Sequence, residues 1–291
     1  MSDLSSLPSE TFDFIVLGSG FGGSVSALRL AEKGYSVLVV EEGKRWRSQD
    51  FPKTNWNLRK SQWQPQLGCH GISRVDWLGD VLVLGGAGVG GGSLVYANTL
   101  VAPTPEVFSQ GWPLPDMRAR LDAHYQTARR MLGATRPPSL GPAEEHLREF
   151  GRSLGRESHF GQPDVGILFG DKEAQEVADP YFGGKGPVRS TCRQCGGCMV
   201  GCRHDAKNTL DKNYLYLAEQ LGAQILPETR AIAIEPDGQA GYLVHVRHSL
   251  GWRRGSRQRL HGRHVIVACG ALGTVDLLLT GAAGPNWQPM A

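Results

Sequence analysis

The stretch that decides the fold runs from Asp13 to Glu41 and reads DFIVLGSGFGGSVSALRLAEKGYSVLVVE. Its apolar run at 13–17 predicts a strand, and a second apolar, β-branched run at 36–40 predicts another. Between them, residues 24–33 have helical spacing, and Gly34 ends the helix. A G-x-G-x-x-G loop therefore joins the first strand to the helix of a βαβ unit, which is typical of dinucleotide-binding proteins.

Each glycine of the loop has a physical reason to be there. Gly18 lets the chain turn out of the strand, Gly20 lets backbone approach a pyrophosphate, and Gly23 lets the helix pack closely on the sheet. The helix N-terminus then faces the phosphates with free N–H groups. Glu41 is placed to accept hydrogen bonds from a ribose diol, and it disfavours NADP by repelling a 2′-phosphate. The alternative is a glycine turn beside a buried strand, and the unit alone does not separate NAD from FAD.

The bulk composition excludes several classes of protein. The chain has 291 residues, 31 basic and 28 acidic, so it implies no strongly charged partner. The basic stretch at 252–264 is interpreted as a solvated hairpin loop, and we expect no nucleic acid partner. No transmembrane stretch of about eighteen apolar residues occurs. Residues 1–12 lack the pattern of a signal peptide, so we expect a cytoplasmic protein.

Further elements follow the opening unit. Residues 81–84 predict a buried strand, which leads into a second glycine loop at 85–93. Asp116 is expected to cap a helix that runs to residue 132, and 144–154 predicts another helix. Residues 161–190 are predicted to be rich in loops.

The last third of the chain returns to sheet. A helix is expected over 206–221, and a last buried strand over 264–268 leads into a helix at 275–280. A small antiparallel meander is predicted from strands at 224–234, 242–248 and 258–261. Pieces of parallel sheet at both ends predict an α/β nucleotide-binding domain interrupted by a second region. The expected division is 11–100 and 204–281 for the nucleotide-binding domain, 101–203 for a partial substrate region and 282–291 for a tail.

Four cysteines fall within eleven residues in the spacing C-x2-C-x2-C-x3-C: Cys192, Cys195, Cys198 and Cys202. This spacing is that of half a bacterial ferredoxin motif, although Arg203 stands where a proline usually follows. An iron–sulfur cluster, a zinc ion and reduced thiols all remain open. A cytoplasmic location disfavours disulfides.

The order of these blocks resembles the glucose-methanol-choline (GMC) family of FAD oxidoreductases, and within it the bacterial cholesterol oxidase type. The resemblance extends from residue 13 to about residue 281. It is carried by the stretches 14–46, 84–99, 179–184, 192–216 and 265–279.

The resemblance implies FAD as the cofactor and a Rossmann-like parallel sheet with a β-meander. It places the first glycine loop at the pyrophosphate, Glu41 at the adenosine ribose, and the second glycine loop against the flavin. Residues 96–98 (Tyr-Ala-Asn) stand where the family pattern has Asn-Gly-Gly, and Asn98 would replace the missing amide. The residues that the resemblance assigns to FAD are Gly18, Gly20, Phe21, Gly22, Gly23, Glu41, Gly88, Gly90, Gly91, Gly92, Ser93, Asn98, Ala231, Ala268 and Gly270.

The implied activity is oxidation of a CH–OH group, with a sterol as substrate in steroid metabolism. The alternatives are an alcohol or sugar dehydrogenase that relays electrons through a cluster at Cys192–Cys202, and a non-catalytic FAD-binding remnant. The family's catalytic pair, a histidine with an asparagine or a second histidine, lies in a C-terminal half that no segment here matches, so no catalytic residue is nominated. We therefore expect a truncated chain that works with a complementing C-terminal fragment or an electron acceptor.

Overall fold

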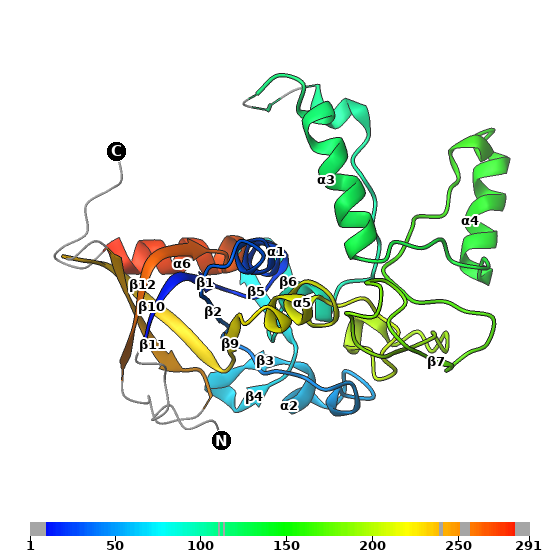
Figure 1. Cartoon of the computed structure of the whole chain (residues 1–291). Helices are drawn as coiled ribbons and strands as arrows, with labels where there is room; N and C mark the ends of the chain where they lie inside the picture. The colour runs from blue at the N-terminus through cyan, green and yellow to red at the C-terminus, as the bar shows by residue number, and fades with distance from the viewer. Residues whose placement is uncertain (1–9, 110, 113, 239–240, 251–256, 283–291) are drawn as a thin grey trace.

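The central sheet is built around β1 (Thr11–Leu17), the strand that the opening stretch predicts (Figure 1). β1 pairs in parallel with β2 (Val37–Val40) on one side and with β12 (Gln258–Val267) on the other. Beyond β2 lies β9 (Gln224–Leu226), also parallel, and the sheet order is β10-β11-β12-β1-β2-β9. The computed structural model describes residues 10–109, 111–112, 114–238, 241–250 and 257–282.

The antiparallel part of the sheet consists of β10 (Thr229–Asp237), β11 (Gly241–His248) and the first half of β12. The strand predicted over 224–234 is wrong, because the chain breaks at Pro227 and at Glu228, whose φ is 56°, and forms β9 and β10 separately. The strands predicted at 258–261 and 264–268 are instead one strand, β12. Gly262 stays in the strand and lies so close to Ile15 that a Cβ there would come within 2.8 Å of its side chain.

The parallel strands are buried on both faces, as expected for a sheet covered by helices. Val16 and Val39 point to one face, where α1 (Phe21–Ala31) and α5 (Tyr214–Gln220) pack. The opposite face carries Leu17 together with residues of the meander and of α6 (Gly270–Ala282). The predicted βαβ unit is thus confirmed in order and position.

Helix α5 begins later than the sequence predicts. The segment Ala206–Thr209 is extended, because Leu168 N donates to Ala206 O and Asn208 N donates to Gly166 O, both at 2.8 Å. The helix begins at Tyr214, whose N–H is capped by the side chain of Asn213 at 2.6 Å. A tertiary pairing therefore replaces the first two turns of the predicted helix.

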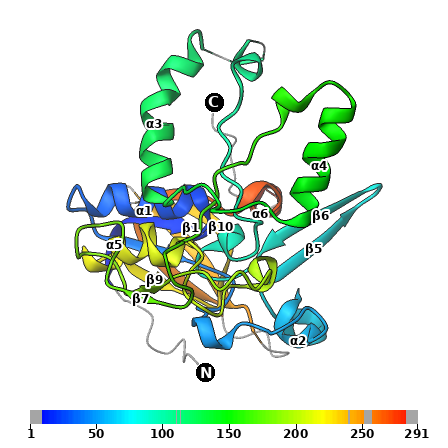
Figure 2. The ribbon, with the colours of Figure 1, turned by 90° about the vertical axis from the view of Figure 1, so that its right-hand side faces the viewer.

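The strand predicted at 81–84 exists as β6 (Val81–Gly86) but is not buried. It pairs only with β5 (Ser73–Leu78), and this hairpin projects from the body (Figure 2). Val81, Leu82 and Leu84 are 58%, 52% and 64% exposed. Beside the hairpin lie three short elements, α2 (Leu58–Ser61), β3 (Trp63–Gln64) and β4 (Cys69–His70).

Two helical arms, α3 (Met117–Met131) and α4 (Pro142–Ser153), rise from the same side of the body (Figure 2). Both confirm predicted helices, but the capping by Asp116 is wrong, since its φ is 55° and its side chain makes no capping bond. The loop-rich segment that follows contains only the short pair β7 (Glu176–Val177) and β8 (Arg189–Ser190) among its described strands. No helix in the part of the chain that the structure describes has the length and apolarity that crossing a membrane requires.

Candidate cofactor-binding site

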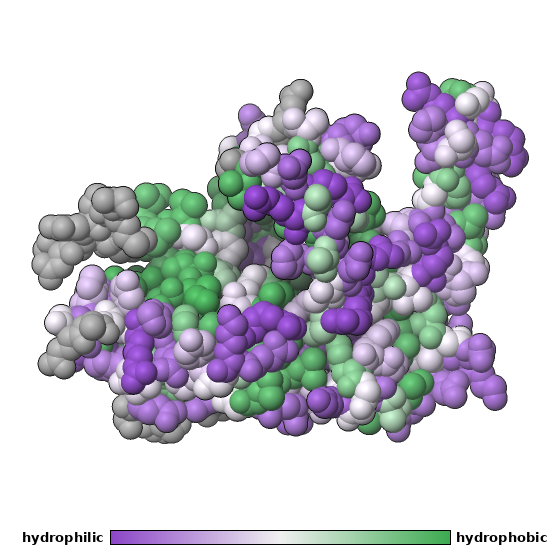
Figure 3. Space-filling model, turned by 45° about the horizontal axis from the view of Figure 1, so that its top comes forward, coloured by the Kyte–Doolittle hydropathy of each residue, from purple (hydrophilic) through white to green (hydrophobic). Residues whose placement is uncertain are grey.

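A cavity of about 320 Å³ opens where the carboxyl ends of β1, β2 and β12 meet. The first glycine loop follows β1 directly, and Gly18 N donates to Val40 O at 2.8 Å. In Figure 3 a hollow lies beside the apolar surface that gathers over α6. Ligands of open α/β sheets bind outside the carboxyl ends of the strands, so this is the expected place for a cofactor.

The first glycine loop cannot accept larger side chains without moving the backbone. Gly18 has a φ of 96°, and a Cβ there would lie 2.4 Å from Ala268 O. A Cβ on Gly23 would lie 1.9 Å from Gly18 O. Gly20 differs, because a Cβ there meets no atom within 4 Å. The space in front of Gly20 is therefore open to a ligand.

The start of α1 fits an anionic group. Gly20 is the N-cap of this eleven-residue helix, and no side chain caps the helix or places an acid in its first turn. The first N–H groups of a helix need partners from outside the helix, and phosphates supply them well. The residues present at this site thus fit the pyrophosphate of a dinucleotide.

Ser19 joins the two glycine loops, and the sequence analysis did not single it out. Its side chain is fully buried, and its Oγ accepts a hydrogen bond from Gly90 N at 3.0 Å. The same Oγ donates to Glu41 Oε2 at 2.6 Å. A Cβ on Gly91 would lie 2.8 Å from Gly20 Cα, so the two loops are in direct contact.

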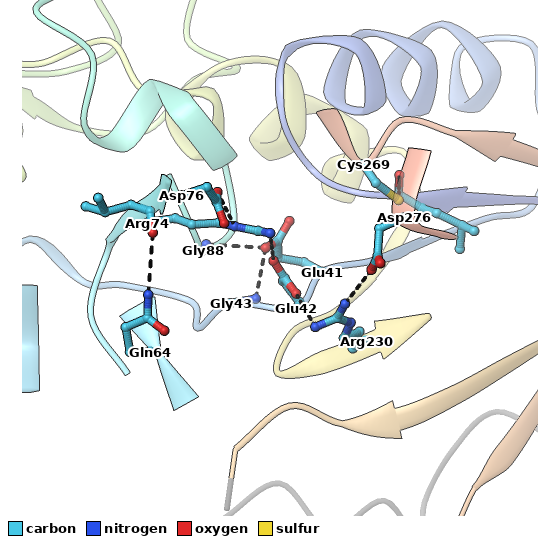
Figure 4. Close-up of polar contacts among 12 residues, drawn as sticks. Glu41, Glu42, Gly43, Gln64, Arg74, Asp76, Gly88, Arg230, Cys269 and Asp276 are labelled. Carbon is cyan, nitrogen blue, oxygen red and sulfur yellow. Dashed lines mark hydrogen bonds and ion pairs between the residues drawn. The ribbon is translucent and has the colours of Figure 1, made fainter. Parts of the chain in front are cut away.

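Glu41 is buried at the junction of these loops. Its carboxylate accepts from the backbone N–H of Ser19 at 3.1 Å, of Gly43 at 2.9 Å and of Gly88 at 3.3 Å (Figure 4). Burial raises the pKa of Glu41, and these hydrogen bonds act in the opposite direction. Glu41 lines the cavity, and it also holds the second glycine loop against the first.

Comparison with known proteins agrees with this geometry. The FAD binding domain model matches residues 13–52, and the GMC oxidoreductase model matches residues 188–290. The chain is therefore similar to GMC oxidoreductases over residues 188–290 and to FAD binding domains over residues 13–52. The FAD and fold-class predictions are confirmed, and the glycine loops described above lie in and between the matched segments.

Individual relatives of the chain point the same way. It is 43% identical to a cholesterol oxidase of Acinetobacter baumannii and 46% identical to a cholesterol oxidase of Mycobacterium tuberculosis, over 92% of this chain in each case. It spans about half their length, 50% and 47% respectively. Pyridoxine 4-oxidase from Mesorbium loti shares the fold, with a TM-score of 0.52 at 16% identity over 92% of this chain and 51% of that chain.

The cavity brings together about half of the residues assigned to FAD. Those that line it are Gly18, Gly20, Glu41, Gly91, Gly92, Ala231, Ala268 and Gly270. Those outside its lining are Phe21, Gly22, Gly23, Gly88, Gly90, Ser93 and Asn98. Ser93 supports the second loop from behind, since its Oγ donates to Gly90 O at 2.7 Å and accepts from Leu210 N at 3.0 Å. Asn98 is buried with a φ of 66°.

Lys207 is a second buried polar residue that the sequence analysis missed. Its Nζ donates to Leu94 O at 2.9 Å, to Tyr96 O at 2.8 Å and to Cys198 O at 2.9 Å. Burial lowers its pKa to about 8, and the side chain is 1% exposed. Lys207 thus fastens the segment after the second glycine loop to the cysteine segment.

The cysteine segment surrounds a separate cavity of about 260 Å³, which all four thiols line. The cysteines are free, and burial raises the pKa values of Cys192 and Cys198, which favours the protonated thiol. Across the described residues, no group of three or more His, Cys, Asp or Glu is arranged to hold a metal ion. The iron–sulfur and zinc predictions therefore have no matching ligand arrangement in this structure.

Proposed function

We propose that this chain serves an FAD-dependent oxidoreductase that acts on the CH–OH group of a sterol. The observation that carries the proposal is the contact of two glycine loops at one cavity, beside the uncapped N-terminus of α1. The sterol is supported by the two cholesterol oxidases to which the chain is 43% and 46% identical.

The contribution of this chain to the reaction is binding and orientation. When bound, FAD supplies an isoalloxazine ring that accepts hydride from the alcohol carbon. The N–H groups at the start of α1 and the open face of Gly20 receive the pyrophosphate. Glu41 and Ser19 keep the second glycine loop in place beside it.

No residue of the described chain is proposed as the base that takes the hydroxyl proton. Alcohol oxidation needs such a base within hydrogen-bonding reach of the substrate. No histidine lines the cavity beside the glycine loops within the part of the chain that the structure describes. A complementing segment, like the second half of the relatives, would supply it.

FAD binding by the purified chain tests the cofactor part of the proposal. The wild-type chain and Gly20→Val are titrated with FAD, and flavin fluorescence quenching gives the dissociation constants. A valine at position 20 fits the fold but fills the approach to the cavity, so we expect at least a tenfold weaker complex. Equal affinity of the two proteins would contradict the site.

The substrate class is tested by anaerobic mixing of the FAD-loaded chain with cholesterol, with a primary aliphatic alcohol or with glucose. We expect no flavin bleaching by the chain alone, and bleaching by cholesterol once the C-terminal half of the Mycobacterium tuberculosis cholesterol oxidase is added. Bleaching by the aliphatic alcohol or glucose in preference to cholesterol would contradict the sterol proposal. Bleaching of the chain alone would contradict the placement of the base.

A further inference from the structure

A chain of alternating charges borders the cavity (Figure 4). Arg230 on β10 pairs with Asp276 on α6 at 2.8 Å and lies 4.0 Å from Glu42. Glu42 also pairs with Arg74 on β5 at 3.1 Å, and Arg74 reaches Asp76 at 2.8 Å. Three elements and the loop after β2 are therefore joined along one rim.

The Arg230–Asp276 pair contributes little to folding stability. The side chains of Arg230 and Asp276 are 40% and 58% exposed, and exposed pairs are typically worth about 0–1 kcal/mol. Their arrangement is nevertheless specific, since all five residues line the cavity. The rim thus has a role in shaping the cavity rather than in holding the fold.

The Arg230–Asp276 pair lines the same cavity as Gly20 and Glu41, and the step that places a base beside this pair rests on the proposed FAD function. With the pyrophosphate at Gly20 and the ribose at Glu41, the further lining of the cavity includes Ala231, Cys269 and Leu277. Arg230 and Asp276 close this continuation from β10 and α6. A guanidinium group is planar and weakly hydrated, so it stacks well on flat aromatic rings.

We propose that Arg230 stacks on the adenine ring of FAD, with Asp276 fixing the plane of its guanidinium, so that the pair selects an adenine dinucleotide. Arg230 is in this view a specificity residue for the cofactor, and Asp276 is a positioning residue. Glu42 and Arg74 extend the same rim toward the ribose.

The test uses the 291-residue chain and two probes, adenosine 5′-diphosphate and uridine 5′-diphosphate, titrated by calorimetry. Both probes carry the ribose and the diphosphate, but the uracil ring stacks less well. We expect wild type to prefer ADP, and Arg230→Ala to weaken ADP binding about tenfold while UDP binding changes by less than about threefold. An unchanged ratio of the two affinities would overturn the inference.

Two further variants separate stacking from charge. Arg230→Lys keeps the charge but loses the planar group, so it should weaken ADP binding almost as much as Arg230→Ala does. Wild-type affinity for ADP in Arg230→Lys would overturn the stacking role. Asp276→Asn should weaken the binding of ADP more than the binding of UDP. The loss of ADP affinity should be smaller than the loss caused by Arg230→Ala. The matched control is Arg45→Ala, which breaks an ion pair of 2.6 Å and similar exposure outside the cavity lining and should leave both probes unaffected.

The outcomes also separate this inference from the proposed function. If wild type binds FAD while Arg230→Ala binds ADP like wild type, the stacking role fails and the FAD site stands. If wild type binds neither FAD nor ADP, both fail.

Discussion

The strand β1 and the helix α4 are both set by a clear sequence pattern, yet they are held in different ways. Ile15 and Val16 of β1 are 0% exposed, because helices cover both faces of the sheet. Helix α4 buries no residue, and Leu147 and Phe150 on it are each 61% exposed. Hydrophobic periodicity in the sequence therefore determines whether a segment forms a helix or a strand, whereas the burial of that helix or strand depends on what packs against it.

Helix α4 is stabilised by local interactions rather than by a buried core. Pro142 stands in the first turn of α4, and the Glu144 side chain accepts a hydrogen bond from Gly141 N at 3.0 Å. Such capping contributes on the order of 1 kcal/mol, whereas a buried leucine contributes several times more. We therefore expect the sheet region and the arm to respond very differently to substitution.

The largest effect is expected for Gly18→Val in the first glycine loop. A side chain there combines a φ of 96° with a backbone oxygen at 2.4 Å, and we expect a loss of about 4 kcal/mol or more in the free energy of unfolding. Urea denaturation measures it. Gly20→Val is the control, since its Cβ meets nothing within 4 Å, and its stability should stay within about 1 kcal/mol of wild type. Equal losses for the two variants would contradict the loop geometry.

A smaller but still large effect is expected for Leu215→Ala on α5. Leu215 is 0% exposed in the core shared with α1, so its truncation should cost about 3 kcal/mol. Leu147→Ala on the arm makes the same chemical change and should stay within about 0.5 kcal/mol. Chemical denaturation of both variants measures the difference, and similar costs would show that the arm is packed in solution.

The pH dependence of Lys207 gives the smallest of the three effects. Its pKa is about 8 in the folded chain against an ordinary value of 10.5, so the unfolded chain binds more protons between these values. The free energy of unfolding should therefore rise with pH across this window, by about 2 kcal/mol more in wild type than in Lys207→Met. Denaturation at pH 7.5, 9 and 10.5 measures it. Parallel pH profiles would show that Lys207 stays protonated when buried.

Elements fixed by short-range spacing were predictable from the sequence. The βαβ unit, both glycine loops and the helices of the two arms follow from residues within a turn or two of each other. The exposure of β6 and the late start of α5 depend on distant contacts, such as Asn208 N with Gly166 O. Periodicity carries no information about these contacts.

The candidate site divides in the same way. The glycines and Glu41 were predictable, because turns, close backbone approach and an acid after the second strand have recognisable spacing. Ser19, Lys207 and Arg230 were not, since each works through partners far away in the chain; Lys207 and Leu94 are 113 positions apart. Common residue types in such positions leave no local pattern.

The position of β1 in the middle of the sheet also determines when folding can finish. One edge of β1 pairs with β2, but the other pairs with β12, and Arg263 of β12 is 250 positions from its partner Asp13. At roughly 5–20 residues per second of synthesis, that apolar edge waits roughly ten seconds or more for its partner. An open, apolar strand edge is a template for pairing with other chains. The yield of soluble protein should therefore depend on how well β1 is shielded during translation. Slower folding at low temperature, or a chaperone that covers strand edges, should change this yield more than a stabilising mutation does.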